Sequence, residues 1–178
     1  KLPDTWAEDY FDIPSSKNFY DCVDKPRMDA DSTAYVDTCY EEDIYVGYRY
    51  FDTFQKKVRY PFGYGLSYSE FDIEAKEICY DGDFLNLKIA VENVGERPGK
   101  EVVQIYIEAP QGKLGKPVRT FAGYAKTKEL AANESEKISI SCPKSYFASY
   151  DDAGITGHKS AFVLEAGEYK VYVGNSVA

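Results

Sequence analysis

The sequence predicts a mainly β protein, an antiparallel β-sandwich preceded by an irregular segment. The first observation is an alternation of apolar and polar residues with a period of two, clearest at residues 85–92. The second is that Asn, Gly and Pro cluster between such segments, as at residues 93–99, where they supply the conformations a chain reversal needs. The third is that residues 73–178 contain no helical pattern of ordinary length. Together these features favour a sandwich or a small barrel.

Each predicted strand follows from its local pattern. Valine and isoleucine at positions 103, 105 and 107 face one way, and Pro and Gly at residues 110–117 break the chain before the next strand. The strands are expected at residues 71–78, 85–91, 103–107, 119–126, 138–142, 162–164 and 169–173. Residues 146–150 have room for a single helical turn. About seven strands in about 110 residues is near the usual size of an immunoglobulin-like sandwich, so this half is expected to fold alone.

Composition and charge exclude several classes of function. The 178 residues are 44% apolar and 29% charged, which is globular composition, and no stretch reaches the ~20 apolar residues of a membrane helix. The formal charge of −9 would repel nucleic acid and anionic membrane surfaces, so neither is expected as a partner. His158 is the only histidine, which leaves almost no material for a histidine-based triad or a multi-histidine metal site.

The four cysteines give a weak signal about the compartment. Cys22, Cys39, Cys79 and Cys142 show no C-x-x-C spacing. An even count permits disulfides in a secreted protein, but buried or idle thiols of a cytoplasmic protein are the preferred interpretation. No basic, apolar leader opens the chain, although Lys1 is not a natural start and an upstream signal is not excluded.

The first part of the chain is not expected to fold without help. Residues 1–72 hold ten of the 17 tyrosines and six of the ten phenylalanines, yet residues 1–40 show no sustained period. Such a segment has too few grouped apolar side chains to offset its ordering entropy, and its aromatic residues look suited to lie on a larger surface. Residues 44–51 are predicted to form a strand that is apolar on both faces, whose burial would have to come from outside this chain. In the absence of other domains, residues 1–40 are expected to be loosely held.

Three segments resemble a known family. Residues 2–6 (LPDTW) resemble the L-P-x-T-W motif of family 3 glycoside hydrolases, the β-glucosidase and β-xylosidase group. Residues 40–52 (YEEDIYVGYRYFD) resemble that family's Y-x-E-G-I-Y-V-G-Y-R-Y-Y-D segment. Residues 60–71 (YPFGYGLSYSEF) resemble its P-F-G-Y-G-L-S-Y-T-x-F junction into a fibronectin type III-like domain, whose second and third strands residues 93–106 then resemble. The resemblance covers essentially the whole chain.

Two positions depart from the family pattern. Asp43 stands where the family usually has Gly, which bears on a special backbone conformation at this position. Ser69 stands where the family usually has Thr, a chemically mild change.

The resemblance implies a division into two parts. Residues 1–66 would be the closing segment of the family's α/β-sandwich domain with a linker, and residues 67–178 the fibronectin type III-like β-sandwich. The expected partners are the remaining barrel and α/β-sandwich domains of a parent enzyme, with a homo-oligomer also possible. An independent carbohydrate- or protein-binding module is the alternative.

The resemblance also implies that the catalytic groups lie elsewhere. A retaining glycosidase needs two carboxyl groups about 5–5.5 Å apart, a nucleophile and an acid/base. In the family the nucleophile is an Asp in an S-D-W-type motif of the barrel, which this sequence lacks, and the acid/base Glu precedes the L-P-x-T-W motif. The chain is therefore expected to have no catalytic residue and to bind no cofactor and no metal. The whole enzyme would remove terminal β-linked glucose or xylose.

Charged and glycine-rich motifs favour structural interpretations. Adjacent carboxylates at residues 41–43 point to opposite faces of a strand, so a solvated or interface run is favoured over an acid/base pair. At residues 151–152 a polar loop is favoured over a calcium site, because the full ligand pattern is missing. Gly63-x-Gly65 lacks the rest of a phosphate loop and suits a turn. His158 is expected in a surface loop, and Asn133 opens a glycosylation sequon that matters only in a secreted protein.

The aromatic residues of the first part allow two interpretations. Trp6 and the tyrosines at 45, 48, 50, 64 and 68 would suit a sugar-stacking platform. Packing between domains is favoured, because the family uses these segments to join domains. Arg49 lies among these residues and is expected to be stacked and paired structurally rather than to bind substrate.

Overall fold

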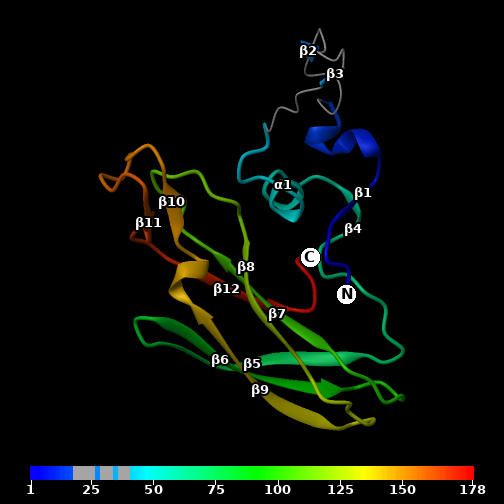
Figure 1. Ribbon diagram of the computed structural model, residues 1–178. Coiled ribbons are helices and arrows are strands. Elements are labelled where there is room, and N and C mark those ends of the chain that lie inside the picture. Colours follow the sequence, from blue (N-terminus) through cyan, green and yellow to red (C-terminus); the bar gives the residue numbers. More distant parts are fainter. Residues whose placement is uncertain (18–26, 29–33, 36–40) are drawn as a thin grey trace.

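Two three-stranded antiparallel sheets pack face to face in the second part of the chain (Figure 1). The structure is a computed structural model that describes residues 1–17, 27–28, 34–35 and 41–178. One sheet has the order β5 (Phe71–Tyr80), β6 (Phe84–Asn93), β9 (Ser135–Pro143), and the other has the order β12 (Lys170–Gly174), β7 (Val102–Glu108), β8 (Thr120–Lys126). The expected β-sandwich is thus confirmed.

The alternating positions of the central strands form the core. On β6, every second side chain points inward, and Leu87, Ile89 and Val91 meet Val103 and Ile105 from β7 across the sandwich. All five side chains are almost completely buried. Burial of an aliphatic side chain of this size contributes roughly 1.5–3 kcal/mol, so these strands carry much of the stability of the sandwich.

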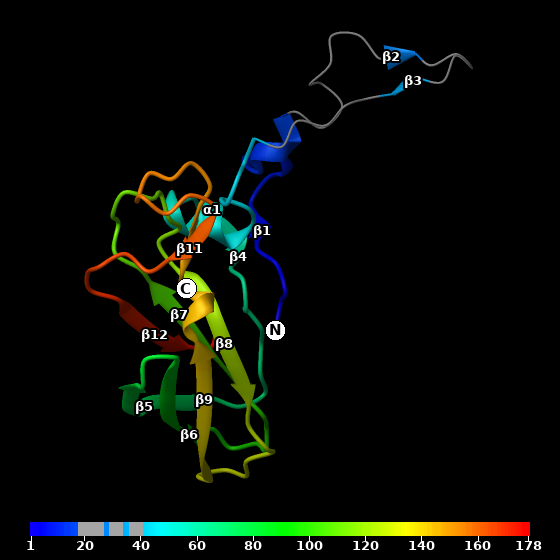
Figure 2. The same cartoon turned by 60° about the vertical axis from the view of Figure 1, so that its left-hand side comes forward.

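A short hairpin extends from the sandwich between β9 and β12 (Figure 2). It is formed by β10 (Ser149–Asp151) and β11 (Ala161–Val163), which pair antiparallel. The turn expected at residues 146–150 forms slightly earlier, as the 3-10 helix η3 (Lys144–Tyr146), because residues 149–151 are drawn into the hairpin.

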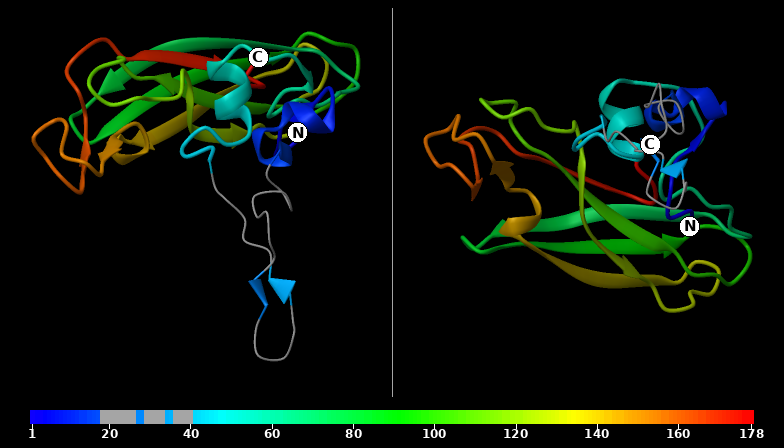
Figure 3. Two further views of the ribbon diagram at one scale, coloured as in Figure 1. Left: turned by 90° about the horizontal axis from the view of Figure 1, so that it is seen from above. Right: turned by 45° about the horizontal axis from the view of Figure 1, so that its top comes forward.

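Residues 1–66, called the leader below, contain short elements. Figure 3 shows that its described helices gather on one side of the sandwich. The elements are β1 (Trp6–Ala7), η1 (Tyr10–Asp12), η2 (Pro14–Lys17), β2 (Arg27–Met28), β3 (Ala34–Tyr35), α1 (Tyr48–Thr53) and β4 (Val58–Tyr60). β1 pairs with β4 and β2 with β3, each antiparallel. Within the described ranges, no helix combines the length and the apolar character that crossing a membrane requires.

The strand predicted at residues 44–51 is wrong. Residues 48–53 form the helix α1, which begins after Gly47 at φ +59° and ψ −133°, a conformation that favours glycine. Because almost every residue in this segment is apolar, the sequence pattern could not separate a period of two from a helical period. The helix buries Phe51 to 5% exposure within this chain, so the burial that was expected only from other domains is partly supplied here.

Candidate functional site

The described part of the leader meets the sandwich along α1, and this contact, called the junction below, is the candidate site. Asp52 of α1 accepts two hydrogen bonds from the guanidinium of Arg119, from Nε at 2.8 Å and from Nη2. The backbone N–H of Val118 donates to Thr53 Oγ1 at 3.0 Å. Hydrogen bonding to Asp52 raises the pKa of Arg119 above its already high value, so the guanidinium keeps its charge at all ordinary pH values.

An aromatic cluster fills the junction beneath the ion pair. The backbone N–H of Phe121 on β8 donates to the Tyr48 hydroxyl at 2.8 Å, and the Tyr48 ring lies 5.0 Å from Phe62 and 6.1 Å from Tyr106, measured between ring centroids. Tyr106 is buried at the centre of the cluster and donates its hydroxyl hydrogen to Gln104 Oε1. Burial raises the pKa of the Tyr106 phenol, which therefore stays neutral and keeps this hydrogen bond.

Gly63 makes the closest backbone approach in the junction. Its φ is +82°, and a Cβ at this position would lie 2.4 Å from Gln104 Oε1. Gln104 Nε2 also donates to the backbone oxygen of Asn175 at 2.9 Å. The glycine motif at residues 63–65 is therefore a structural turn, as the sequence indicated. Its first glycine allows residues 61–70, the linker between β4 and β5, to lie against β7.

Both ends of the described chain are attached to the same linker. The N–H of Leu2 donates to Tyr64 O at 2.7 Å, and the N–H of Val177 donates to Phe62 O at 3.0 Å. Lys1 Nζ lies 2.9 Å from Glu101 Oε1 on the sandwich. These contacts hold the segment around the LPDTW motif against the sandwich.

Thr5 of this motif has an unusual environment. Its side chain is buried, and in the part of the chain that the structure describes, Thr5 Oγ1 is the one buried side-chain oxygen or nitrogen without a hydrogen-bond partner. It lines a cavity of about 530 Å³ beside the junction, together with Phe51 and Arg119. A buried hydroxyl normally has a partner, so Thr5 stands out among the described residues.

The two acidic runs have structural roles. Glu42 Oε1 accepts a hydrogen bond from the N–H of Ser15 at 2.9 Å, which joins two parts of the leader. Asp43 has φ +51°, so the backbone conformation that a glycine favours is kept with an aspartate, which tolerates it better than most residues. The carboxylate of Asp151 is buried and accepts from the N–H groups of Gly154 (2.7 Å), Ile155 (2.9 Å) and Thr156 (2.7 Å).

Asp151 therefore shapes the loop between β10 and β11, whereas the sequence suggested only a polar loop. The hydrogen bond from the Thr156 hydroxyl, followed by the backbone N–H bonds, lowers the pKa of Asp151 to about 2. An aspartate held in this way is saturated with donors and has no lone pair directed at a substrate.

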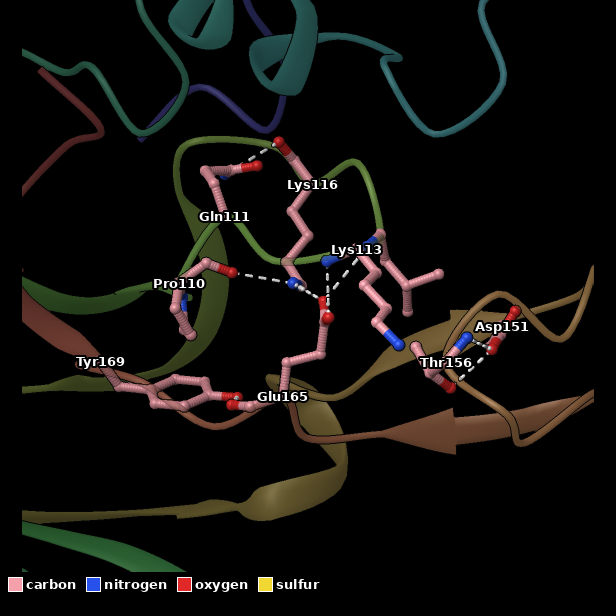
Figure 4. Close-up of polar contacts among 9 residues, drawn as sticks. Pro110, Gln111, Lys113, Lys116, Asp151, Thr156, Glu165 and Tyr169 are labelled. Atoms are coloured by element: carbon pink, nitrogen blue, oxygen red, sulfur yellow. Dashed lines mark hydrogen bonds and ion pairs between the residues drawn. The ribbon is translucent and has the colours of Figure 1, made fainter.

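Glu165 plays the same role for the loop before β8 and was not predicted from the sequence (Figure 4). Its carboxylate accepts from the N–H groups of Lys113 and Leu114 and from Lys116 Nζ, which also donates to Pro110 O at 2.8 Å. Hydrogen bonding to the Lys116 ammonium lowers the pKa of Glu165. A single acidic residue near a turn gives no sequence signal for a partner 49 positions away.

The other candidate residues are dispersed. His158 and Asn133 are exposed in loops, as expected. Cys79 is exposed and Cys142 buried, and both are free thiols, whereas Cys22 and Cys39 lie outside the described residues. Among the residues with described positions, no group of three His, Cys, Asp or Glu side chains could hold a metal ion.

The aromatic residues proposed as a sugar platform do not form one continuous surface. Tyr48 is taken up by the junction, and Tyr64 lies against Tyr60 with ring centroids 4.9 Å apart. Tyr45 and Tyr50 both contact Phe54, at 5.2 and 5.3 Å. Tyr68 is 91% exposed in the linker. Arg49, which was expected to be stacked and paired, lines a separate groove. The arginine that is paired and stacked in the junction is Arg119, whose guanidinium lies 5.4 Å from the ring of Tyr172.

Comparison with known proteins agrees with this architecture. The fibronectin type III-like domain family matches residues 101–177. A β-glucosidase from Ruminococcus albus is 51% identical over 99% of this chain and 17% of its own length. β-Glucosidase A from Butyrivibrio fibrisolvens is 44% identical over 99% of this chain and 22% of its own length.

A solved structure has the same fold. The β-glucosidase from Paenibacillus barengoltzii superposes with a TM-score of 0.87 at 47% identity, over 99% of this chain and 18% of that protein. The chain thus spans about one fifth of the length of these relatives. It therefore corresponds to the part of family 3 β-glucosidases that contains the fibronectin type III-like domain.

Proposed function

We propose that the chain is the non-catalytic supporting portion of a retaining β-glucosidase that removes terminal β-linked glucose. The single observation that carries the proposal is the junction, in which the Asp52–Arg119 ion pair and the Tyr48 hydroxyl fasten the leader to β8. In the proposed arrangement, residues 1–66 are continuous with the α/β-sandwich domain and residues 67–178 are the supporting sandwich. The junction then transmits the rigidity of the sandwich to the domains that hold the substrate.

The chemistry of the described residues supports this assignment. The carboxylates of buried Asp151 and partly buried Glu165 are occupied by donors, Asp151 by the loop that follows it and Glu165 by residues 113–116. A glycosidase instead needs one carboxylate free to attack and one acid with a raised pKa, and both must reach the same sugar. The proposed partners of the chain are therefore the barrel and the α/β-sandwich domain, which would supply both groups.

The exposed apolar side chains of the leader support a contact with further domains. Trp6, Tyr10, Phe11 and Phe54 are all about half exposed or more. The centroids of the Tyr10 and Phe11 rings lie 5.4 Å apart, and adjacent exposed apolar side chains can mark an interaction surface. The buried, unpaired Thr5 hydroxyl lies in the same part of the molecule and would gain a partner from such a contact.

The test compares the whole β-glucosidase with its Asp52→Ala variant. Loss of the ion pair should shorten the half-life of the activity at elevated temperature and leave KM for an aryl β-glucoside unchanged, because the substituted residue touches no substrate. Glu96→Ala, in an exposed turn of the sandwich, is the matched control and should leave the half-life unchanged. A lowered kcat or a raised KM without loss of thermal stability would contradict a supporting role.

The isolated 178-residue chain provides the second arm. It should not hydrolyse an aryl β-glucoside above the rate of a heat-treated sample. Turnover above that control would show that the catalytic carboxylates lie in this chain, and the proposal would then be wrong.

A further inference from the structure

A second groove lies away from the junction cavity, between the leader and the β10–β11 hairpin. Its volume is about 700 Å³, within the usual range for binding sites of small molecules. Four segments line it: residues 43–49 of the leader, residues 107–109 at the end of β7, residues 114–121 before and into β8, and residues 145–162 around the hairpin. Figure 1 shows α1 and the hairpin on the same side of the sandwich, with the loop that precedes β8 between them.

One wall of the groove consists of exposed aromatic rings. Tyr146, Tyr150 and Phe162 line it and are 56%, 51% and 70% exposed. The rings of Tyr150 and Phe162 meet edge to face with centroids 5.1 Å apart, so one ring supports the other. Tyr45 of the leader also lines the groove, near Gly115. The groove is therefore lined by aromatic side chains from both the hairpin and the leader.

Polar groups stand among these rings. Asp43 and Asp152 are exposed and Arg49 is half-buried, and the hydroxyl side chains of Ser145 and Ser149 also line the groove. The centre of a protein–protein contact is normally depleted of charged residues, so this mixture does not suit a protein partner. The fourth charged side chain, Lys116, is paired with Glu165. This leaves two acidic side chains and one basic side chain to face a ligand. A neutral ligand rich in hydroxyl groups fits this balance better than an anion.

Two loops that line the groove are held in place by the carboxylates of buried Asp151 and partly buried Glu165. Asp151 fixes the chain at residues 154–156 on the hairpin side, and Glu165 fixes residues 113–116 on the other side. Figure 4 shows the contacts of Glu165 and those between Asp151 and Thr156. A site whose walls are fixed before the ligand arrives loses little conformational entropy on binding. These carboxylates thus have a role in keeping the groove open.

We propose that this groove is an accessory binding site for a β-linked gluco-oligosaccharide. A β-glucopyranose ring has apolar C–H faces that suit the Tyr150 and Phe162 rings, and its equatorial hydroxyl groups suit hydrogen bonding to the Asp152 carboxylate and the serine hydroxyls of the same groove. The choice of glucose rests on the proposed function, while the groove and its preference for a neutral, hydroxyl-rich ligand do not. A volume of about 700 Å³ accommodates several sugar units rather than one.

The test titrates the 178-residue chain with cellobiose, cellotriose and cellopentaose by isothermal calorimetry, and follows amide signals by NMR. Saturable binding is expected in the millimolar range, tighter for the longer sugars, with shifts concentrated at residues 145–162. Tyr150→Ala and Phe162→Ala should each weaken binding about tenfold, the effect of losing roughly 1.4 kcal/mol of ring contact. Phe162→Tyr keeps the ring and should bind like the parent chain. Because both side chains are largely exposed, these variants should keep the thermal midpoint of the parent.

Tyr68→Ala is the matched control, since Tyr68 is an exposed aromatic residue that does not line the groove. It should bind like the parent chain. The proposal is overturned by an absence of saturable binding, by equal loss in Tyr68→Ala, or by full binding in both alanine variants. None of these results alters the thermal inactivation of the whole enzyme by Asp52→Ala, so the supporting role and the groove are tested separately.

Discussion

Arg119 holds the leader and the last strand of the sandwich at the same time: its guanidinium binds both carboxylate oxygens of Asp52 and lies 5.4 Å from the ring of Tyr172 on β12. The ion pair is partly shielded, with side-chain exposures of 23% for Arg119 and 14% for Asp52. A two-point contact of this geometry is more specific and stronger than an ordinary surface pair. Arg119 therefore supplies the charged contact that holds α1 on the sandwich, beside the hydrogen bonds of Thr53 and Tyr48.

Substitution of Asp52 should loosen α1 without unfolding the sandwich. Asp52→Ala leaves a partly buried guanidinium unpaired, and we expect docking of α1 to lose about 2 kcal/mol. Amide hydrogen exchange should speed up at residues 48–54, while the amides of β6 keep their protection. Arg119→Lys should cost nearly as much, because lysine cannot reproduce the two-point contact.

A double-mutant cycle provides the control for this prediction. If the two residues act on each other, Asp52→Ala combined with Arg119→Ala should cost clearly less than the sum of the single changes. Additive effects would show that the ion pair does not determine the position of α1.

The loop after β10 should become mobile in acid. The carboxyl group of Asp151 has an ordinary pKa of 3.8 in the unfolded chain and a pKa of about 2 in the folded protein, because the Thr156 hydroxyl and three backbone N–H groups bind its ionised form. A lowered pKa in the folded state means that its contribution is complete above about pH 4 and is lost as the pH falls toward 2. NMR signals of Gly154, Ile155 and Thr156 should shift together over this range.

Thr156→Val removes the hydroxyl donor and keeps the shape of the side chain. The acid transition of the loop should then move to higher pH, toward the ordinary value for an aspartate. An unchanged transition would mean that the backbone N–H groups alone set the pKa of Asp151.

The strands could be predicted from the sequence because each has its own local pattern. Leu87, Ile89 and Val91 alternate with polar residues, and burial of one sheet face requires that alternation. The strand prediction at residues 44–51 was wrong because the apolar residues there are nearly continuous and show neither a strand period nor a helical period. Gly47 carried the available signal, since a glycine before an aromatic run permits the backbone conformation that starts α1.

The contacts of the candidate sites could not be predicted in the same way. Asp52 and Arg119 are 67 positions apart, and Lys116 and Glu165 are 49 apart. Neither pair has a local pattern, because each forms only when the loops between strands are brought together by the sandwich. The LPDTW motif and the linker motif did indicate where the junction lies, but they did not indicate which side chains make it.

Truncation of Ile89 should destabilise the whole sandwich. Ile89 is fully buried on β6 and pairs with Ile138 on β9. Ile89→Ala removes three carbon atoms from the centre of the core and should lower the free energy of unfolding by about 3–4 kcal/mol, measured by urea denaturation. Ile78→Ala, at a half-exposed position on β5, is the control and should change it by less than about 1 kcal/mol. Similar losses for both variants would mean that β6 is not the centre of the core.

Gly63→Ala should disrupt the packing of the linker against β7 in the junction. At φ +82° an alanine is strained by about 1 kcal/mol, and its Cβ would overlap the side chain of Gln104, which must then give up its hydrogen bonds to Tyr106 and Asn175. The two effects together should lower the free energy of unfolding by about 3 kcal/mol.

Gly82→Ala separates the backbone strain from the overlap: its φ is +100° but no atom lies within 4 Å of the added Cβ, so only the backbone strain is expected. Gln104→Ala in the Gly63→Ala background should recover part of the loss, because the overlap disappears. If Gly63→Ala costs no more than Gly82→Ala in urea denaturation, the close approach of the linker to β7 does not stabilise the junction.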